Sequence, residues 1–196
     1  MNKNLKLLLI GLGAAAIFFV FANSGYLWKN LQYTIVKPQP LPTPASEQIM
    51  EPDVLTIESL AIKAPVIYVD QADEPTIQNA LINGVVHYPS TAKPGELGND
   101  YIFGHSSDFR WSSGHYKTIF ALLPKIEVGA TITLSDSQGH PFTYIVTEKQ
   151  VVAANDLRWL GQDKTKKILT LQTSYPLGTA LKRFIVRAEL LEPGKF

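Results

Sequence analysis

Residues 168–190 read ILTLQTSYPLGTALKRFIVRAEL and fall into two strand-like segments on either side of a turn. Residues 168–173 and 184–190 are rich in β-branched and apolar side chains, and a proline and a glycine stand between them, which is typical of neighbouring strands. A hairpin-like return of the chain would bring Ser174, just past the first strand, to the same end of the sheet as Arg183, which opens the second.

Similar segments recur from residue 54 onward, separated by Gly, Pro and Asn turns. Two short helices are also expected: one from Asp73 through Leu81, and one over residues 116–123 that stops at Pro124. About seven or eight strands with two or three short helices predict a mainly β fold, a closed or nearly closed β-barrel. The strands are expected at residues 55–57, 66–69, 101–103, 130–134, 142–152, 168–173 and 184–190.

The composition excludes several classes of function. The chain has 196 residues, of which 45% are hydrophobic and 18% charged, and its net charge is +1 without a long Lys/Arg run. Binding to nucleic acid therefore has no electrostatic support. The chain has no cysteine, which excludes disulfides, cysteine-based zinc sites and a cysteine nucleophile. No metal site or cofactor is expected, because the four histidines, His87, His105, His115 and His140, lack metal-binding spacing.

The N-terminus predicts a membrane anchor. Lys3 and Lys6 precede an uncharged apolar stretch over residues 7–22, and Tyr26 and Trp28 follow where an aromatic belt would lie. We expect a cytoplasmic tip and transmembrane helix over residues 1–28, a Pro-rich linker over 29–53 with an extended run at 37–44, and a globular domain over 54–196. The alternative is a signal peptide cleaved near Ala22. Both interpretations place the domain outside the cell.

Three residues are candidates for chemistry. His105 directly follows the strand at 101–104 and precedes two serines, a position suited to acid/base work. Ser174 ends a strand that is expected to be buried. Arg183 begins the next strand, where a fixed guanidinium can stabilise an oxyanion during acyl transfer. Each of these residues, taken alone, is also compatible with a surface or strand-end position of no catalytic consequence.

Several motifs together resemble a known family. They are IESLAIKAPV (57–66), GVVHYPSTAKPGE (84–96), GNDYIFGHSS (98–107), TLQTSYP (170–176) and KRFIVRAEL (182–190). In this order they are similar to the sortases, membrane-anchored transpeptidases of bacterial surfaces, over about residues 54–192. The resemblance implies a sortase-like barrel in which His105 matches the catalytic histidine and Arg183 the catalytic arginine. Ser174 occupies the position of the nucleophilic cysteine.

The same resemblance implies a reaction and its partners. A sortase cleaves an LPxTG-like sorting-signal peptide of a surface protein through an acyl-enzyme, and an amine acceptor from the cell wall or a pilin then takes the acyl group. No cofactor is implied. Thr173 belongs to the signature next to Ser174. Leu157, Trp159 and Leu160 lie in the segment where the family places its substrate-selecting loop, so these residues are candidates for substrate binding.

Ser174 departs from the family pattern. A thiol loses its proton near pH 8.5, whereas an alcohol has no comparable anion near neutrality and needs an efficient general base. Three interpretations stand side by side: an engineered substitution that traps a substrate complex, a natural and inactive peptide-binding protein, or a natural Ser/His peptidase with His105 as base. The peptidase would need an orienting carboxylate that the sequence does not identify. Impaired catalysis is expected.

Overall fold

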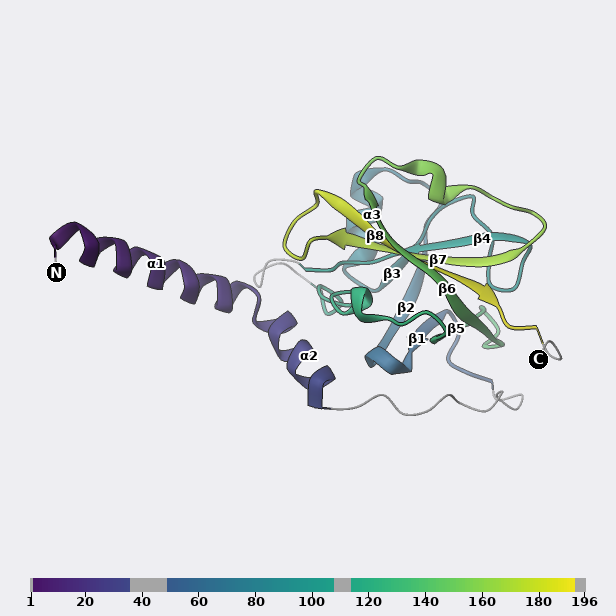
Figure 1. Ribbon diagram of the computed structural model, residues 1–196. Coiled ribbons are helices and arrows are strands. Elements are labelled where there is room, and N and C mark those ends of the chain that lie inside the picture. The colour runs from purple at the N-terminus through teal and green to yellow at the C-terminus, as the bar shows by residue number, and fades with distance from the viewer. Residues whose placement is uncertain (1, 36–48, 108–113, 193–196) are drawn as a thin grey trace.

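The fold is a closed barrel of eight strands, seen in a computed structural model that describes residues 2–35, 49–107 and 114–192 (Figure 1). Around the barrel the strands follow the order β1-β2-β3-β4-β7-β8-β6-β5. The mainly β barrel that the sequence predicts is confirmed. The strands are β1 (Val54–Ile57), β2 (Ile62–Tyr68), β3 (Val85–His87), β4 (Gly98–Phe103), β5 (Thr131–Ser135), β6 (Pro141–Ala153), β7 (Lys167–Tyr175) and β8 (Lys182–Leu190).

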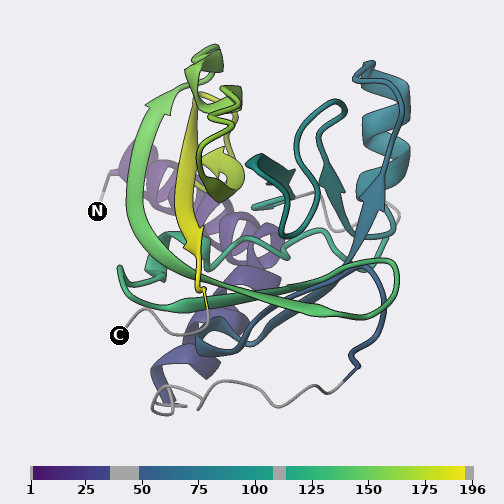
Figure 2. The same ribbon diagram turned by 90° about the vertical axis from the view of Figure 1, so that its right-hand side faces the viewer.

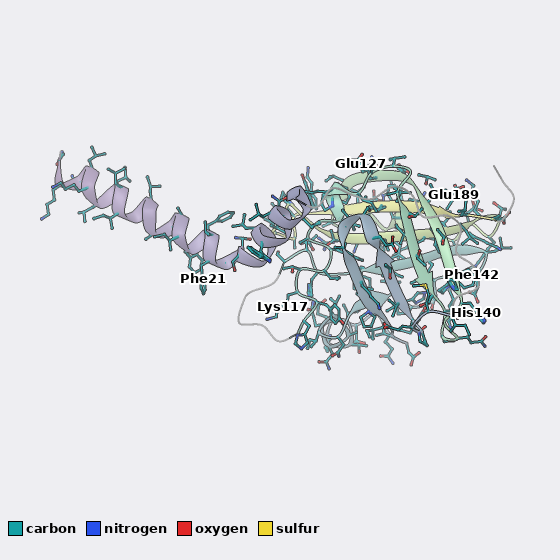
Figure 3. All side chains as sticks on the ribbon, turned by 90° about the horizontal axis from the view of Figure 1, so that it is seen from below. Phe21, Lys117, Glu127, His140, Phe142 and Glu189 are labelled. Atoms are coloured by element: carbon teal, nitrogen blue, oxygen red, sulfur yellow. The ribbon has the colours of Figure 1, made fainter. Side chains whose placement is uncertain are left out.

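Short helices connect the strands, and two helices precede the barrel. The first of these, α1, projects away from the barrel, and α2 follows it directly (Figures 1 and 3). The helices are α1 (Lys3–Ala22), α2 (Ser24–Ile35) and α3 (Glu74–Leu81), and the 3-10 helices are η1 (Glu58–Leu60), η2 (Leu123–Lys125) and η3 (Leu157–Leu160).

The first helix has the properties of a membrane span. It is long and apolar enough to cross a bilayer, with a mean hydropathy of 2.4, and none of its residues is buried. An apolar surface of this kind is costly in water and stable in lipid, so α1 fits membrane anchoring. The helix α2 continues through Ile35, into the range expected to be linker. The Pro-rich run at 37–44 lies outside the described residues.

The pairings around β7 and β8 position the candidate residues. β4 lies parallel to β7, with pairs from Gly98 with Lys167 to Phe103 with Gln172. β7 then returns antiparallel as β8. The long strand β6 curves along the barrel beside β8 (Figure 2). Because β4, β7 and β8 are neighbours, the C-terminal ends of β4 and β7 and the N-terminal end of β8 lie side by side at one end of the barrel.

Apolar side chains fill the barrel interior. The strands alternate, so every second residue faces inward and packs with residues from the opposite wall. Burying each of these large side chains stabilises the fold by roughly 1.5–3 kcal/mol. The fully buried members include Leu55, Ile57, Ile102, Leu123, Ile126, Ile132, Leu134, Leu169 and Leu171. A second cluster, outside the wall, contains Tyr101, Val152, Trp159 and Ile185.

One expected helix is confirmed. The helix α3 begins where Asp73 accepts a hydrogen bond from the Thr76 amide at 3.1 Å, as an N-cap residue does. Pro75 lies in its first turn, where the missing N–H costs nothing. Its buried face, Ala80 and Leu81, packs against Val86 of β3.

The prediction of a helix over residues 116–123 is wrong. Residues 116–123 form successive turns that end in the 3-10 helix η2. The amide of Ile119 bonds to the carbonyl of Tyr116, three residues back, in place of the four-residue step of an α-helix. The amide of Phe120 donates to the carbonyl of His105 at 2.9 Å, outside the segment altogether. A tertiary hydrogen bond therefore overrides the helical periodicity.

A carboxyl and an imidazole are buried together inside the barrel. Asp100 is 1% exposed, and His87 Nε2 lies 3.6 Å from Asp100 Oδ1. Within the described residues neither Asp100 oxygen has a hydrogen-bond partner, and His87 Nε2 donates to the Ala92 carbonyl at 2.9 Å. Burial, reinforced by the nearby Glu96 charge, raises the pKa of Asp100 well above its usual range, and burial lowers the pKa of His87. The neutral form of both groups is favoured.

We expect Asp100→Asn to stabilise the protein near neutral pH by about 1 kcal/mol or more. Because the folded Asp100 carboxyl holds its proton above the pH at which the unfolded chain loses it, the wild-type protein loses stability as pH rises from about 4. Asn does not titrate, so its advantage should shrink as pH falls towards 4. Chemical denaturation at several pH values measures this, with the exposed Asp70→Asn as control. A constant difference across pH would contradict the assignment.

Candidate active site

The three candidate residues lie in one row across three neighbouring strands. The register of β4 with β7 pairs Phe103 with Gln172, and the same offset continued by two residues pairs His105 with Ser174. On the other side of β7, Ser174 pairs directly with Arg183 of β8. Neighbouring strands are about 4.8 Å apart, so the three backbones are within reach of one another's side chains. We call these residues the His–Ser–Arg row.

The side chains of this row share the outer face of the barrel wall. Successive side chains of a strand point to opposite faces. Leu171 and Phe184 belong to the interior core, so Ser174 and Arg183 point outward. On β4 the interior face carries Ile102, and the alternation assigns His105 to the outer face. Ser174, Arg183 and His105 are all half-buried.

Backbone contacts hold His105 in place. The Gly104 amide donates to the Gln172 carbonyl at 3.1 Å, which extends the pairing of β4 with β7 past the end of the strand. A Cβ at Gly104 would lie 2.9 Å from a ring carbon of Phe120, so glycine is needed for this close approach. The bond from the Phe120 amide to the His105 carbonyl then clamps the residue from the other side.

Thr173, an expected substrate-binding residue, has a different position. It is 2% exposed, and its hydroxyl donates to the Gly104 carbonyl at 2.8 Å. Its side chain therefore lies on the interior side of β7, opposite to Ser174. The Thr173 side chain thus joins the ends of β4 and β7. Thr173 therefore influences the position of the His–Ser–Arg row through the backbone.

The connection between β7 and β8 positions Arg183. Nη1 of Arg183 donates to the carbonyls of Ala180 and Lys182, at 2.9 and 3.1 Å. The Gly178 amide in the same connection donates to Ser107 Oγ at 3.0 Å. These bonds tie the segment after His105 to the segment after Ser174, which includes a cis peptide bond at Tyr175–Pro176. The guanidinium is thereby fixed against the β7–β8 connection, next to the end of β7.

The helix η3 covers part of the same outer face. Trp159 packs against Tyr101, Val152 and Ile185, and Leu160 lies at the edge of this cluster. The Trp159 carbonyl accepts a hydrogen bond from Asn99 Nδ2 at 2.8 Å, which anchors η3 to β4. Of the three expected loop residues, Trp159 is thus a buried anchor, Leu160 is half-buried, and Leu157 is 71% exposed.

Further residues of the same face lie between η3 and the His–Ser–Arg row, and the sequence patterns did not identify them as site residues. Phe103, Gln172 and Ile185 form a second row, two residues from the first along β4, β7 and β8. The Tyr101 hydroxyl donates to Gln172 Oε1 at 2.7 Å. The signal that would have found them is the strand period of two: residues two positions before His105 and Ser174 share their face.

A separate open pocket lies beyond η3, away from the His–Ser–Arg row. It has a volume of about 420 Å³, and its lining includes Arg158, Gln162, Lys166, Arg187 and Glu189. Figure 3 shows Glu189 at the end of the barrel away from α1. Since Arg183 and Glu189 are six residues apart on β8, this pocket is about 20 Å from the row and does not contain it.

The arrangement suits acyl transfer more than metal chemistry. Across residues 2–35, 49–107 and 114–192, no group of three or more His, Cys, Asp or Glu side chains is placed to hold a metal ion. A hydroxyl, an imidazole and a guanidinium share one face, as nucleophile, proton carrier and oxyanion donor would. Asp100 cannot orient His105, because it points into the barrel from the opposite face of β4.

Comparisons with known proteins identify the family and the fold. The sortase domain model matches residues 55–191. Among solved structures, the chain is similar to a sortase D5 transpeptidase of Clostridium perfringens, with 26% identity and a TM-score of 0.58, over 71% of this chain and 78% of that chain. No curated protein matches the chain.

Two further solved structures share the fold. Sortase C1 from Streptococcus agalactiae is 24% identical, with a TM-score of 0.60, over 83% of this chain and 75% of that chain. Sortase A from Corynebacterium diphtheriae is 24% identical, with a TM-score of 0.58, over 77% and 65%. Since the sortase model covers nearly the whole barrel, the chain belongs to the sortase family and has a transpeptidase type of function.

Proposed function

We propose that this sortase cleaves the sorting-signal peptide of a surface protein, with an LPxTG-like motif, and transfers the acyl group to an amine of the cell wall or of a pilin. The observation that carries the proposal is the His–Ser–Arg row on the outer face of β4, β7 and β8. The second row and η3 lie beside it on the same outer face, where an extended peptide would bind.

The proposed reaction has two halves. The Ser174 oxygen attacks the peptide carbonyl carbon while its proton passes to His105, and the C–N bond breaks as His105 delivers that proton to the leaving amine. An incoming amine then attacks the ester, loses its proton through His105 and releases Ser174. Arg183 donates to the oxyanion in both halves, held by its bonds to the β7–β8 connection.

Ser174 makes this a slow enzyme in the proposal. A cysteine at this position would supply a thiolate with modest help, whereas the serine hydroxyl must be deprotonated during the attack. Binding contacts are the same in both cases, so the chemical step carries the difference. Ser174 is also the observation that favours a second candidate function, that of a catalytically inactive, sortase-shaped peptide-binding protein.

The proposed organisation places the reaction outside the cell. Residues 1–28 form a cytoplasmic tip and membrane span, residues 29–53 a linker, and residues 54–196 the catalytic domain. The apolar helix α1 and the basic residues Lys3 and Lys6 at its N-terminal end support this orientation, because short basic flanks stay on the cytoplasmic side.

We expect Ser174→Cys to cleave a suitable sorting peptide and form a thioester, several orders of magnitude faster than the Ser174 protein. The affinity for the peptide should change little, because the two side chains differ mainly in the chemical step. Screening LPxTG-like libraries for binding to the Ser174 protein identifies the peptide, and mass spectrometry detects the acyl adduct. Binding without an adduct or cleavage would favour the peptide-binding protein.

His105→Ala should abolish turnover in the Ser174→Cys background while the fold is kept, because His105 carries the proton in both halves of the reaction. His140→Ala is the matched control: His140 pairs with Asp136 at 3.0 Å, at the end of the barrel away from α1 (Figure 3). Rates of peptide cleavage, with circular dichroism to verify folding, compare the variants. Equal losses at both histidines would show that His105 has no special role.

Protease added to intact spheroplasts should release a fragment that begins in the linker, since the proposed orientation exposes everything after the membrane span. N-terminal sequencing of the fragment locates the cut. A mature chain that begins at Asn23 before any protease is added would identify a cleaved signal peptide instead, and full protection of the domain would contradict the orientation.

A further inference from the structure

The second row differs from the first in having one polar side chain between two apolar ones. Gln172 lies on β7 between Phe103 of β4 and Ile185 of β8, on the same outer face as Ser174. Ile185 is buried and Phe103 half-buried, so the amide of Gln172 is the hydrogen-bonding group of this row. An amide in such an apolar setting is costly unless its polar atoms find partners.

The orientation of this amide is set by Tyr101. The Tyr101 hydroxyl is the partner of Gln172 Oε1, and Tyr101 itself is 3% exposed. Burial raises the pKa of the Tyr101 phenol, so the hydroxyl keeps its proton and remains a donor. With the oxygen of the amide occupied, the Nε2 hydrogens point away from Tyr101. In the described part of the chain, no acceptor bonds to Gln172 Nε2.

The neighbourhood also limits which way a ligand can lie. Trp159 of η3 packs on Tyr101 and Ile185 and closes the face behind the second row. In the proposed function the segment that contains η3 selects the substrate, so a peptide whose reacting carbonyl is at Ser174 extends with its acyl side over Gln172 towards η3. An extended chain rises about 3.3 Å per residue, and Ser174 and Gln172 are two residues apart, so the peptide residue over Gln172 is two positions before the acyl residue.

We infer that Gln172, oriented by Tyr101, donates a hydrogen bond from Nε2 to an acceptor on the substrate residue two positions before the cleaved bond's acyl residue. Gln172 is thus a specificity-determining residue, and Tyr101 is a positioning residue that acts through it. The acceptor is an oxygen of that residue, either its backbone carbonyl or a polar side chain. The inference rests on the proposed function, because it takes Ser174 as the point of attack.

The test uses the full-length Ser174 protein and a fluorescent LPxTG-like peptide selected by its binding. Gln172→Leu removes the donor, and Gln172→Glu keeps the shape and the acceptor for Tyr101 but cannot donate when ionised. Each should weaken binding by about 2- to 12-fold, the usual worth of one hydrogen bond. Thermal unfolding verifies that both variants are folded.

Tyr101→Phe provides the control that separates positioning from packing. Alone, it should weaken binding, because the freed amide can rotate its oxygen towards the peptide. In the Gln172→Leu background it should add nothing, since Tyr101 acts through Gln172. Losses that add in the double variant would show that Tyr101 acts through packing and would overturn its role.

A peptide series identifies the source of the acceptor. Peptides with Ala, Gln or Pro two positions before the acyl residue are compared on wild-type and Gln172→Leu proteins. An equal loss for all three assigns the backbone carbonyl, and a loss confined to Gln assigns the side chain. Unchanged binding of every peptide by Gln172→Leu overturns the inference alone. A wild-type protein that binds no peptide of the library would contradict the proposed function as well.

Discussion

The parallel pairing of β4 with β7 is the constraint on which the candidate site depends. Parallel neighbours cannot be joined by a tight turn, so the chain forms β5 and β6 on the far side of β8 before it returns as β7 beside β4. Their register puts the residue after Gly104 beside the residue after Thr173. Side chains reinforce the pairing at both ends, through Thr170 Oγ1 to Asn99 Oδ1 at 2.7 Å and Thr173 Oγ1 to the Gly104 carbonyl. This pairing therefore aligns His105 with Ser174 on the outer face of the barrel.

The sequence predicted the barrel and the approximate positions of its longer strands along the chain, because β-branched residues, turns and alternation are local signals. It missed the three-residue strand β3, which is too short for a period of two to show. It placed a helix at residues 116–123, where the Phe120 amide is instead bonded to His105, a contact no local pattern reveals. Sequence motifs identify His105, Ser174 and Arg183 as candidates. Gln172 is identified only from the strand register and from its hydrogen bond with the Tyr101 hydroxyl.

The two faces of β4 place titratable side chains in different environments. On the inner face, Asp100 Oδ1 lies 3.6 Å from Nε2 of His87 on β3, which is too far for a good hydrogen bond. Burial favours the uncharged form of both groups. On the outer face, His105 lies half-buried in the same row as Ser174 and Arg183. The alternation of side chains along β4 and its extension thus separates a buried carboxyl that keeps its proton from a half-buried imidazole on the opposite face.

The hydrogen bonds at the two ends of the β4–β7 pairing hold its register independently of the loop that carries η3. The segment between residues 104 and 167 supplies β5, β6 and η3, and η3 rests on the wall through Asn99 and a tryptophan. The entropy of a connection grows slowly with its length, so insertions or deletions near η3 are tolerated while the register persists. Under the proposed function, a change in the length of this loop would alter which peptides bind while the His–Ser–Arg row keeps its alignment.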